Sequence, residues 1–199
     1  MKSFNLYFSR LLSAIFHPIF MPTYGFLLVK YLFFKGTLGS MLLKDSLCFV
    51  FLFTAIIPFL SIGILYKFKK ISSLTLDKPS DRQLPYLITL LSYIVLVIYF
   101  VTPINPFSQY MFVAIVCLML VMLINIVWKI SAHMTAIGGL IAMIMFESYQ
   151  FSLNPYVVIS ILFFIAGLVA YARVYLKSHT ILQTLVGFLL GFVVLIFMF

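Results

Sequence analysis

The sequence predicts an all-α fold, a polytopic membrane bundle of six to seven transmembrane helices. Of the 199 residues, 65% are hydrophobic and only 9% are charged, whereas a soluble domain is about one quarter charged. The apolar stretches are continuous and about as long as the roughly 20 residues that cross a bilayer as a helix. The strands of a membrane β-barrel alternate over about ten residues, a pattern that these stretches do not follow.

The apolar stretches follow one another along the whole chain, which is expected to form a single transmembrane domain over residues 1–199. The first stretch, Leu12–Phe34, contains His17, Pro18 and Pro22. It is therefore expected either to kink or to divide into an interfacial helix and a short span. The later stretches are Cys48–Tyr66, Pro85–Val101, Phe107–Trp128, one that ends at Phe146, Tyr156–Tyr171 and Ile181–Phe199.

Polar residues gather in three connections, at residues 67–83, 129–135 and 173–180. Two spans separate each connection from the next, so all three are expected on one face of the membrane. The connections after the third and fifth stretches, on the opposite face, carry no Lys or Arg. Polar chemistry is thus expected at one face, assembled from segments far apart in the sequence.

Two Arg, two His and one Ser are expected to meet on that face: Arg82, Ser131, His133, Arg173 and His179. This set suits a phosphate group, because a guanidinium donates paired hydrogen bonds to phosphate oxygens. One His can attack phosphorus while the other protonates the leaving oxygen. No metal or other cofactor is expected, because neither His has a carboxylate or Cys at ligand spacing.

Two further groups of residues are expected to lie outside this set. His17, beside Pro18, is expected to be a helix cap or an interfacial anchor. The four acids, Asp45, Asp77, Asp81 and Glu147, all lie away from the middle of a long apolar run. Their position disfavours an ion-coupled transporter, which usually carries ionisable groups inside its spans.

The three polar segments resemble the motifs of the type 2 phosphatidic acid phosphatase superfamily, membrane lipid phosphatases that are related to vanadium haloperoxidases. The family's motifs are K-x6-R-P, P-S-G-H and S-R-x5-H-x3-D. The third motif is matched best, since Arg173, His179 and Gln183 keep its spacing, with Gln183 in the place of the Asp. The second keeps its Ser and His within residues 130–133. The first keeps its Arg at residue 82, with its Pro displaced to residue 85 and Lys78 as the nearest Lys.

The resemblance implies a phosphatase-like core over about residues 67–199 and a role for each matched residue. His179 would be the nucleophile that forms a phosphohistidine, and His133 would be the general acid. Gln183 would orient His179 by accepting its ring N–H, without the negative charge of an Asp. The phosphate oxygens would be held by Arg82, Arg173, Lys78 and Ser131.

The expected function is therefore that of an integral-membrane lipid phosphatase without a cofactor. Its partners would be membrane lipids and a lipid phosphate substrate: phosphatidate, phosphatidylglycerol phosphate or a polyprenyl diphosphate. Two alternatives stay open, namely a degenerate member that binds lipid phosphates without catalysis, and a transporter. The net charge of +9 is attributed to basic residues at span ends, which meet anionic lipid headgroups, and not to nucleic-acid binding.

The expected location is a bacterial inner membrane, which the chain crosses several times. Lys and Arg prevail on the motif face, which favours a cytoplasmic site, whereas the family resemblance favours an external one, so the side stays open. Gly187 and Gly191 form a G-x-x-x-G pattern, which permits close helix packing within the bundle or in a homodimer.

Overall fold

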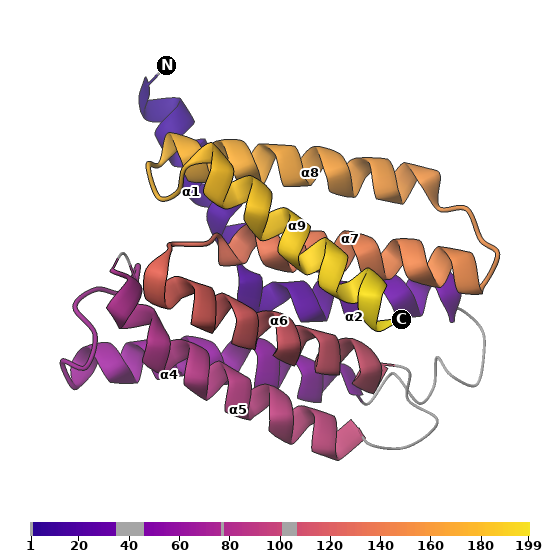
Figure 1. Ribbon diagram of the computed structural model, residues 1–199, viewed down its shortest axis with the longest axis horizontal. Coiled ribbons are helices and arrows are strands. Elements are labelled where there is room, and N and C mark those ends of the chain that lie inside the picture. Colours follow the sequence, from indigo (N-terminus) through magenta and orange to yellow (C-terminus); the bar gives the residue numbers. More distant parts are fainter. Residues whose placement is uncertain (1, 35–45, 77, 101–106) are drawn as a thin grey trace.

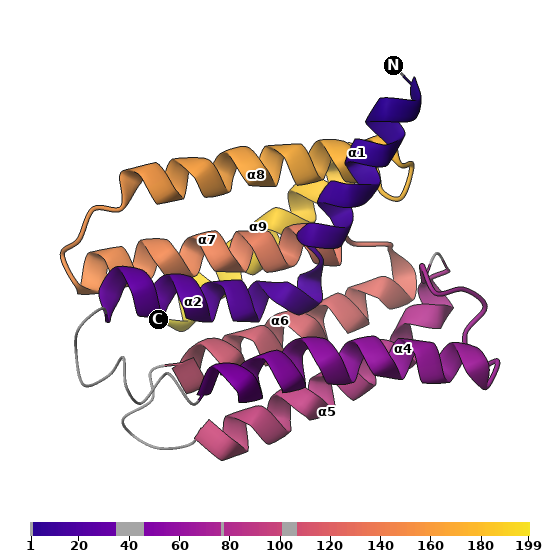
Figure 2. The same cartoon turned by 180° about the vertical axis from the view of Figure 1, so that it is seen from behind.

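The computed structural model describes residues 2–34, 46–76, 78–100 and 107–199, and in these ranges the regular structure is helical. The predicted all-α bundle is confirmed (Figures 1 and 2). In chain order the elements are α1 (Lys2–Ile15), the 3-10 turn η1 (Pro18–Phe20), α2 (Met21–Phe33), the π turn η2 (Leu52–Ile56), α4 (Ile57–Lys67), the 3-10 turn η3 (Pro79–Arg82), α5 (Gln83–Phe100), α6 (Phe107–Val127), α7 (Ala132–Gln150), α8 (Tyr156–Tyr175) and α9 (Ile181–Met198).

Within the described residues, six helical segments are long and apolar enough to cross a membrane. They are Ser3–Phe33, Ser46–Lys67, Pro79–Tyr99, Phe107–Val127, Tyr156–Tyr175 and Ile181–Met198. The protein is therefore a multi-pass membrane protein. Helix α7, which corresponds to the fifth expected span, is the most buried helix and packs against α2, α6, α8 and α9.

The first apolar stretch divides where the sequence changes from helix-forming to helix-breaking residues. Helix α1 ends before His17, and Pro18 opens η1, because proline fits the first turn of a helix but interrupts its interior. In both ribbon views α1 crosses the end of the bundle at a steep angle to the other helices. The chain therefore bends between α1 and α2, as both predicted forms require, and the two helices together make up the apolar segment Ser3–Phe33.

Helices α7 and α9 are in backbone contact because three glycines lie at their crossing. A Cβ on Gly138 would lie 2.2 Å from the Phe188 carbonyl oxygen, and one on Gly191 would lie 1.9 Å from that of Thr135. A Cβ on Gly187 would lie 2.7 Å from the Ser131 oxygen. The G-x-x-x-G pattern therefore serves packing within the chain, and the homodimer stays a prediction without support from this motif.

The three polar connections lie at the same end of the bundle, as the parity of the spans predicts. Figure 1 shows the α4–η3, α6–α7 and α8–α9 connections together at one end, with the α7–α8 connection and the C-terminus at the other. A backbone hydrogen bond of 3.4 Å, from the Ser131 N–H to the Gln183 carbonyl, joins the α6–α7 connection to the first turn of α9. This end of the bundle holds the candidate site.

Glu147 agrees with the prediction that the acids lie away from the middle of an apolar run, but it does not lie in a connection. Helix α7 continues to Gln150, so Glu147 lies within it and is only 4% exposed. Its carboxyl group accepts a hydrogen bond from the Tyr110 hydroxyl on α6. The apolar pattern ends at Phe146, but the helix continues. The buried Glu147 carboxyl group is accommodated there because it is hydrogen-bonded to Tyr110. Asp45 and Asp77 lie outside the described residues.

Candidate functional site

A cavity of about 230 Å³ opens among the helices at the end of the bundle that carries the three polar connections. The cavity is lined there by five basic or imidazole side chains: His17, Arg82, His133, Arg173 and His179. No carboxylate is among its described lining residues. The structure therefore brings together four of the predicted site residues, in a pocket whose fixed charges are positive.

Arg82 reaches the cavity from the 3-10 turn η3 and is only 6% exposed. Its Nε donates a hydrogen bond of 2.8 Å to the carbonyl oxygen of Leu76, in the connection that precedes η3. Leu76 has a φ of 52°, an uncommon conformation for a residue with a branched side chain. The connection thus folds back over Arg82 and fixes the direction of its guanidinium.

Arg173 and His179 lie close together because a Schellman motif ends α8 between them. The Ser178 N–H bonds to the Arg173 carbonyl at 3.1 Å, and the Lys177 N–H bonds to that of Val174 at 2.9 Å. Lys177 takes the left-handed conformation that glycine usually supplies there, with a φ of 54°. This turn reverses the chain, so the R-x5-H spacing places both side chains at one cavity wall.

The partners of His179 define which of its nitrogens carries the proton. Its Nδ1 lies 3.3 Å from the Lys129 carbonyl oxygen and 3.3 Å from Gln183 Oε1. Both partners are acceptors, so Nδ1 is the protonated nitrogen and the lone pair is on Nε2. Burial first, and then the Arg173 and Arg82 charges, lower the pKa of His179 to about 4. The ring is therefore neutral at pH 7.

Gln183 has two functions at the start of α9. Its Oε1 accepts a hydrogen bond of 3.1 Å from the Thr180 N–H, while the Thr180 hydroxyl accepts one of 3.2 Å from the Gln183 N–H. This is a capping box, which satisfies backbone donors that a helix leaves unpaired. The same Oε1 is the atom that meets His179, as the H-x3-Q spacing predicts. The helix cap therefore holds the amide in place beside the imidazole.

His133 lies in the first turn of α7 and is held by the N-terminal helix. Its Nε2 lies 3.1 Å from the carbonyl oxygen of Ser13, near the end of α1. A carbonyl can only accept, so neutral His133 carries its proton on Nε2 and its lone pair on Nδ1. To donate a proton from Nδ1, His133 must first become doubly protonated.

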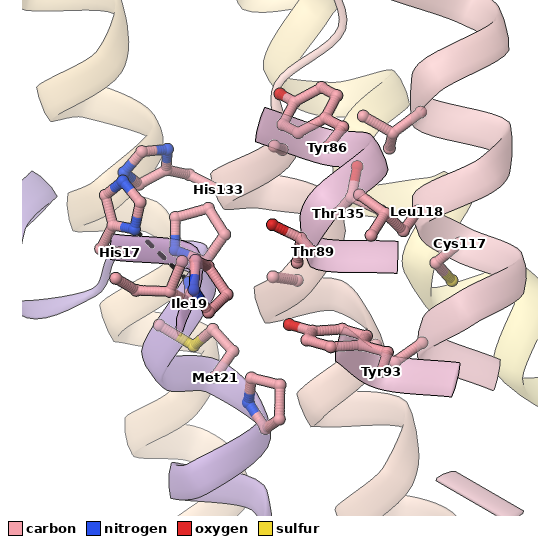
Figure 3. A pocket seen from close by; sticks show the side chains of 18 of the residues that line it. His17, Ile19, Met21, Tyr86, Thr89, Tyr93, Cys117, Leu118, His133 and Thr135 are labelled. Atoms are coloured by element: carbon pink, nitrogen blue, oxygen red, sulfur yellow. Dashed lines mark hydrogen bonds between the residues drawn. The ribbon is translucent and has the colours of Figure 1, made fainter. Parts of the chain in front are cut away.

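The expectation that His17 lies outside the site was wrong, although the expected helix cap is present. Its Nδ1 accepts a hydrogen bond of 3.4 Å from the Ile19 N–H at the start of η1. Its ring also lines the cavity and packs edge-on against that of His133, with 5.2 Å between the ring centroids (Figure 3). The break between α1 and α2 turns this residue towards α7, a contact that no local pattern reveals.

Two predicted phosphate-binding residues are not among the residues that line the cavity. Ser131 is fully buried beneath Gly187 at the α7–α9 crossing, and its hydroxyl has no hydrogen-bond partner in the described part of the chain. Lys78 precedes η3 on the exposed surface, near Asp81. The predicted core boundary at residue 67 also omits part of the cavity wall, because Met21, Gly25 and Pro58 contribute to it.

Three hydroxyl residues of α5 face the cavity and were missed in the sequence. Figure 3 shows the side chains of Tyr86, Thr89 and Tyr93 opposite His17 and His133. They follow Arg82 at offsets of four, seven and eleven residues, the spacing of a single helix face. That periodicity was the available signal, obscured because most of the residues between these positions are apolar.

The described residues contain no group of three His, Cys, Asp or Glu side chains that could hold a metal ion. The basic end of the cavity is lined by imidazoles and guanidiniums, and its interior is largely apolar. Comparisons with protein-family models, with curated proteins and with solved structures find no match for this chain.

Proposed function

We propose that the protein is an integral-membrane lipid phosphatase that hydrolyses the phosphomonoester or pyrophosphate of a lipid through a phosphohistidine. One observation carries this proposal: a neutral His179, oriented through Nδ1, shares a cavity with two Arg and a second His. The order and spacing of the three motifs, which resemble those of type 2 phosphatidic acid phosphatases, support it. A bacterial inner membrane is the location that we propose.

Arg82 and Arg173 would bind the phosphate group. A guanidinium offers several donors in one plane and stays charged in an apolar pocket, so two of them can neutralise a phosphate dianion. Their charge would also stabilise the additional negative charge that develops on the equatorial oxygens during phosphoryl transfer. In this proposal the two Arg supply the electrostatic stabilisation that metal ions provide in other phosphatases.

His179 would be the nucleophile. Its Nε2 lone pair attacks phosphorus while the bond from phosphorus to the ester oxygen breaks, so the phosphoryl group moves to Nε2 and the lipid alkoxide leaves. The proton on Nδ1 stays with its two carbonyl partners. Water then attacks the phosphohistidine, the P–N bond breaks, and inorganic phosphate is released.

His133 would supply the proton that the leaving oxygen needs. Because its Nε2–H is committed to Ser13, the proton for transfer must be on Nδ1. The entering phosphate brings negative charge into a positive cavity, which favours the doubly protonated ring. His133 would then return to its neutral form by protonating the alkoxide, and it would take a proton back from the attacking water.

A second candidate function is lipid-phosphate binding without turnover, and Gln183 is the observation that favours it. Its amide accepts the Nδ1 proton of His179 but cannot stabilise an imidazolium as a carboxylate would. In a serine protease the loss of the equivalent charge lowers kcat by about four orders of magnitude. The same residue is also required by the α9 cap, which alone would account for its presence.

The test is phosphate release by purified protein in detergent with EDTA, using phosphatidate, phosphatidylglycerol phosphate and a polyprenyl diphosphate. We expect turnover that is lost in His179→Ala and falls at least a hundredfold in Arg82→Ala. Lys78→Ala, which changes an exposed charge four residues away, is the matched control. An acid-labile phosphoprotein that is absent from His179→Ala would identify the intermediate.

Three results would contradict this proposal. Turnover that persists in folded His179→Ala would exclude the phosphohistidine. Absence of turnover with all three lipids, together with saturable binding that requires Arg82, would favour the binding protein instead. Uptake of substrate into proteoliposomes without phosphate release would favour a transporter.

A further inference from the structure

The cavity does not end at the basic residues but continues inward between α2, α5, α6 and α7. Beyond His133 its wall on α7 is formed by Ala136, Gly139, Leu140 and Met143. Helix α6 contributes Ala114 to the same inner part. The lining residues nearest the opposite end of the bundle are Phe107, Tyr110 and Leu195. One continuous space therefore joins a cationic end to a largely apolar interior.

The depth of this space equals or exceeds one leaflet of a bilayer. Its lining on α7 extends from Ala132 to Met143, and eleven residues at 1.5 Å each measure about 16 Å. On α6 the lining extends from Phe107 to Val121, or about 21 Å by the same rise. The hydrocarbon core of a bilayer is about 30 Å thick, so one lipid chain extends over about 15 Å.

The cavity has a volume of about 230 Å³ and is lined mainly by apolar side chains away from its basic end. Such a lining suits a hydrocarbon chain held beneath the phosphate.

We infer that the inner cavity binds a single apolar chain of the substrate, and that it makes the enzyme selective for chain length. This inference rests on the proposed function, because it uses the phosphate site as the anchor for one end of the chain. The chain's carbons would contact Leu140, Met143 and Leu195 while the phosphate meets Arg82 and Arg173. A lipid whose chain stays in the bilayer would gain nothing from these contacts.

Two small residues allow the channel to be blocked at different depths. Ala136 lies about 5 Å below His133 along α7, and Ala114 lies about 10 Å below Val121 along α6, from the rise of 1.5 Å per residue. Both line the cavity, so Ala136→Leu and Ala114→Leu would each insert a side chain into it. Gly167→Leu is the matched control, because that position on α8 faces open space and adds the same kind of bulk outside.

The measurement is kcat/KM for butyl, octyl, dodecyl and hexadecyl phosphate, each compared with the wild type in the same detergent. The ratio of variant to wild type cancels the partition of each chain into the micelle. We expect Ala114→Leu to spare butyl phosphate and to lower kcat/KM for dodecyl phosphate at least tenfold. Ala136→Leu should impose its loss at a shorter chain, whereas Gly167→Leu should stay within twofold at every length.

A second measurement does not need turnover. Dodecyl phosphate with a photoreactive group at the chain end should label Met143 or Leu195 in the wild type, and lose this labelling in Ala114→Leu. Labelling of the exposed, outward positions Ile161 and Phe164 instead, with equal losses at all chain lengths, would overturn the inference while leaving the phosphatase intact. Internal labelling without phosphate release would support the cavity and refute the enzyme.

Discussion

The contact between Gln183 and His179 can be tested by giving Gln183 a charge without changing its shape. Gln183→Glu keeps the length of the side chain and the capping box, which accepts Glu as readily as Gln. It places a carboxylate where Oε1 now lies 3.3 Å from Nδ1 of His179. An opposite charge at this distance raises the pKa of a His by about one to three units. From about 4, the pKa of His179 should therefore move to about 5–7.

Modification of His179 by diethylpyrocarbonate measures this pKa directly, because only the neutral ring reacts. Peptide mass spectrometry over pH 3.5 to 8 gives the half-point for each His separately. The wild type should reach its half-point near pH 4, and Gln183→Glu about two pH units higher. Gln150→Glu makes the same change at the far end of α7 and should move nothing. An unmoved His179 half-point in folded Gln183→Glu would show that residue 183 does not contact the ring.

Three further predictions follow from the packing and charge of the site. His17→Asn keeps an acceptor for the cap, so it should fold normally, but phosphate release should fall at least tenfold because the ring against His133 is gone. His17→Phe should keep more activity but lose about 1 kcal/mol of stability. Equal activity in both variants would refute a role for the ring. Gly191→Ala should destabilise the protein by about 1–3 kcal/mol in thermal unfolding, since its Cβ would meet a backbone oxygen of α7 at 1.9 Å, whereas Gly167→Ala should not. The pKa of His179 is lower in the folded chain, at about 4, than in the unfolded chain. The free energy of unfolding should therefore fall by up to about 3 kcal/mol as the pH drops from 6.5 towards 4. His179→Gln should flatten this pH dependence, and an unchanged slope would refute the lowered pKa.

The helical class and the common end of the polar connections could be predicted because they depend on composition and parity. Apolar runs must satisfy their backbone groups internally in a membrane, which leaves few architectures. The contact of His179 with Gln183 was predicted from their four-residue spacing, although its physical basis is the capping box that begins α9 directly after His179. These features depend on residues that are close in the sequence, or on counting spans.

The remaining parts of the site depend on how distant segments pack. His17 enters the cavity because the chain turns at Pro18, and Ser131 is buried because Gly187 lets α9 approach α7. The local sequence around each residue is compatible with either orientation of its side chain. Sequence spacing alone therefore assigned Ser131 to the phosphate and left His17 out.

The sequence by itself determined that this chain lies in a membrane as helices, and that its few polar residues gather at one end. Burial of long apolar runs is a local requirement, so composition is enough to predict it. Only the tertiary structure decided which of these polar residues share a cavity, which nitrogen of His179 holds the proton, and that an apolar channel continues beneath them. Those properties arise from contacts between α1, α5, α7 and α9, whose residues are far apart in the chain and meet only when the bundle is packed.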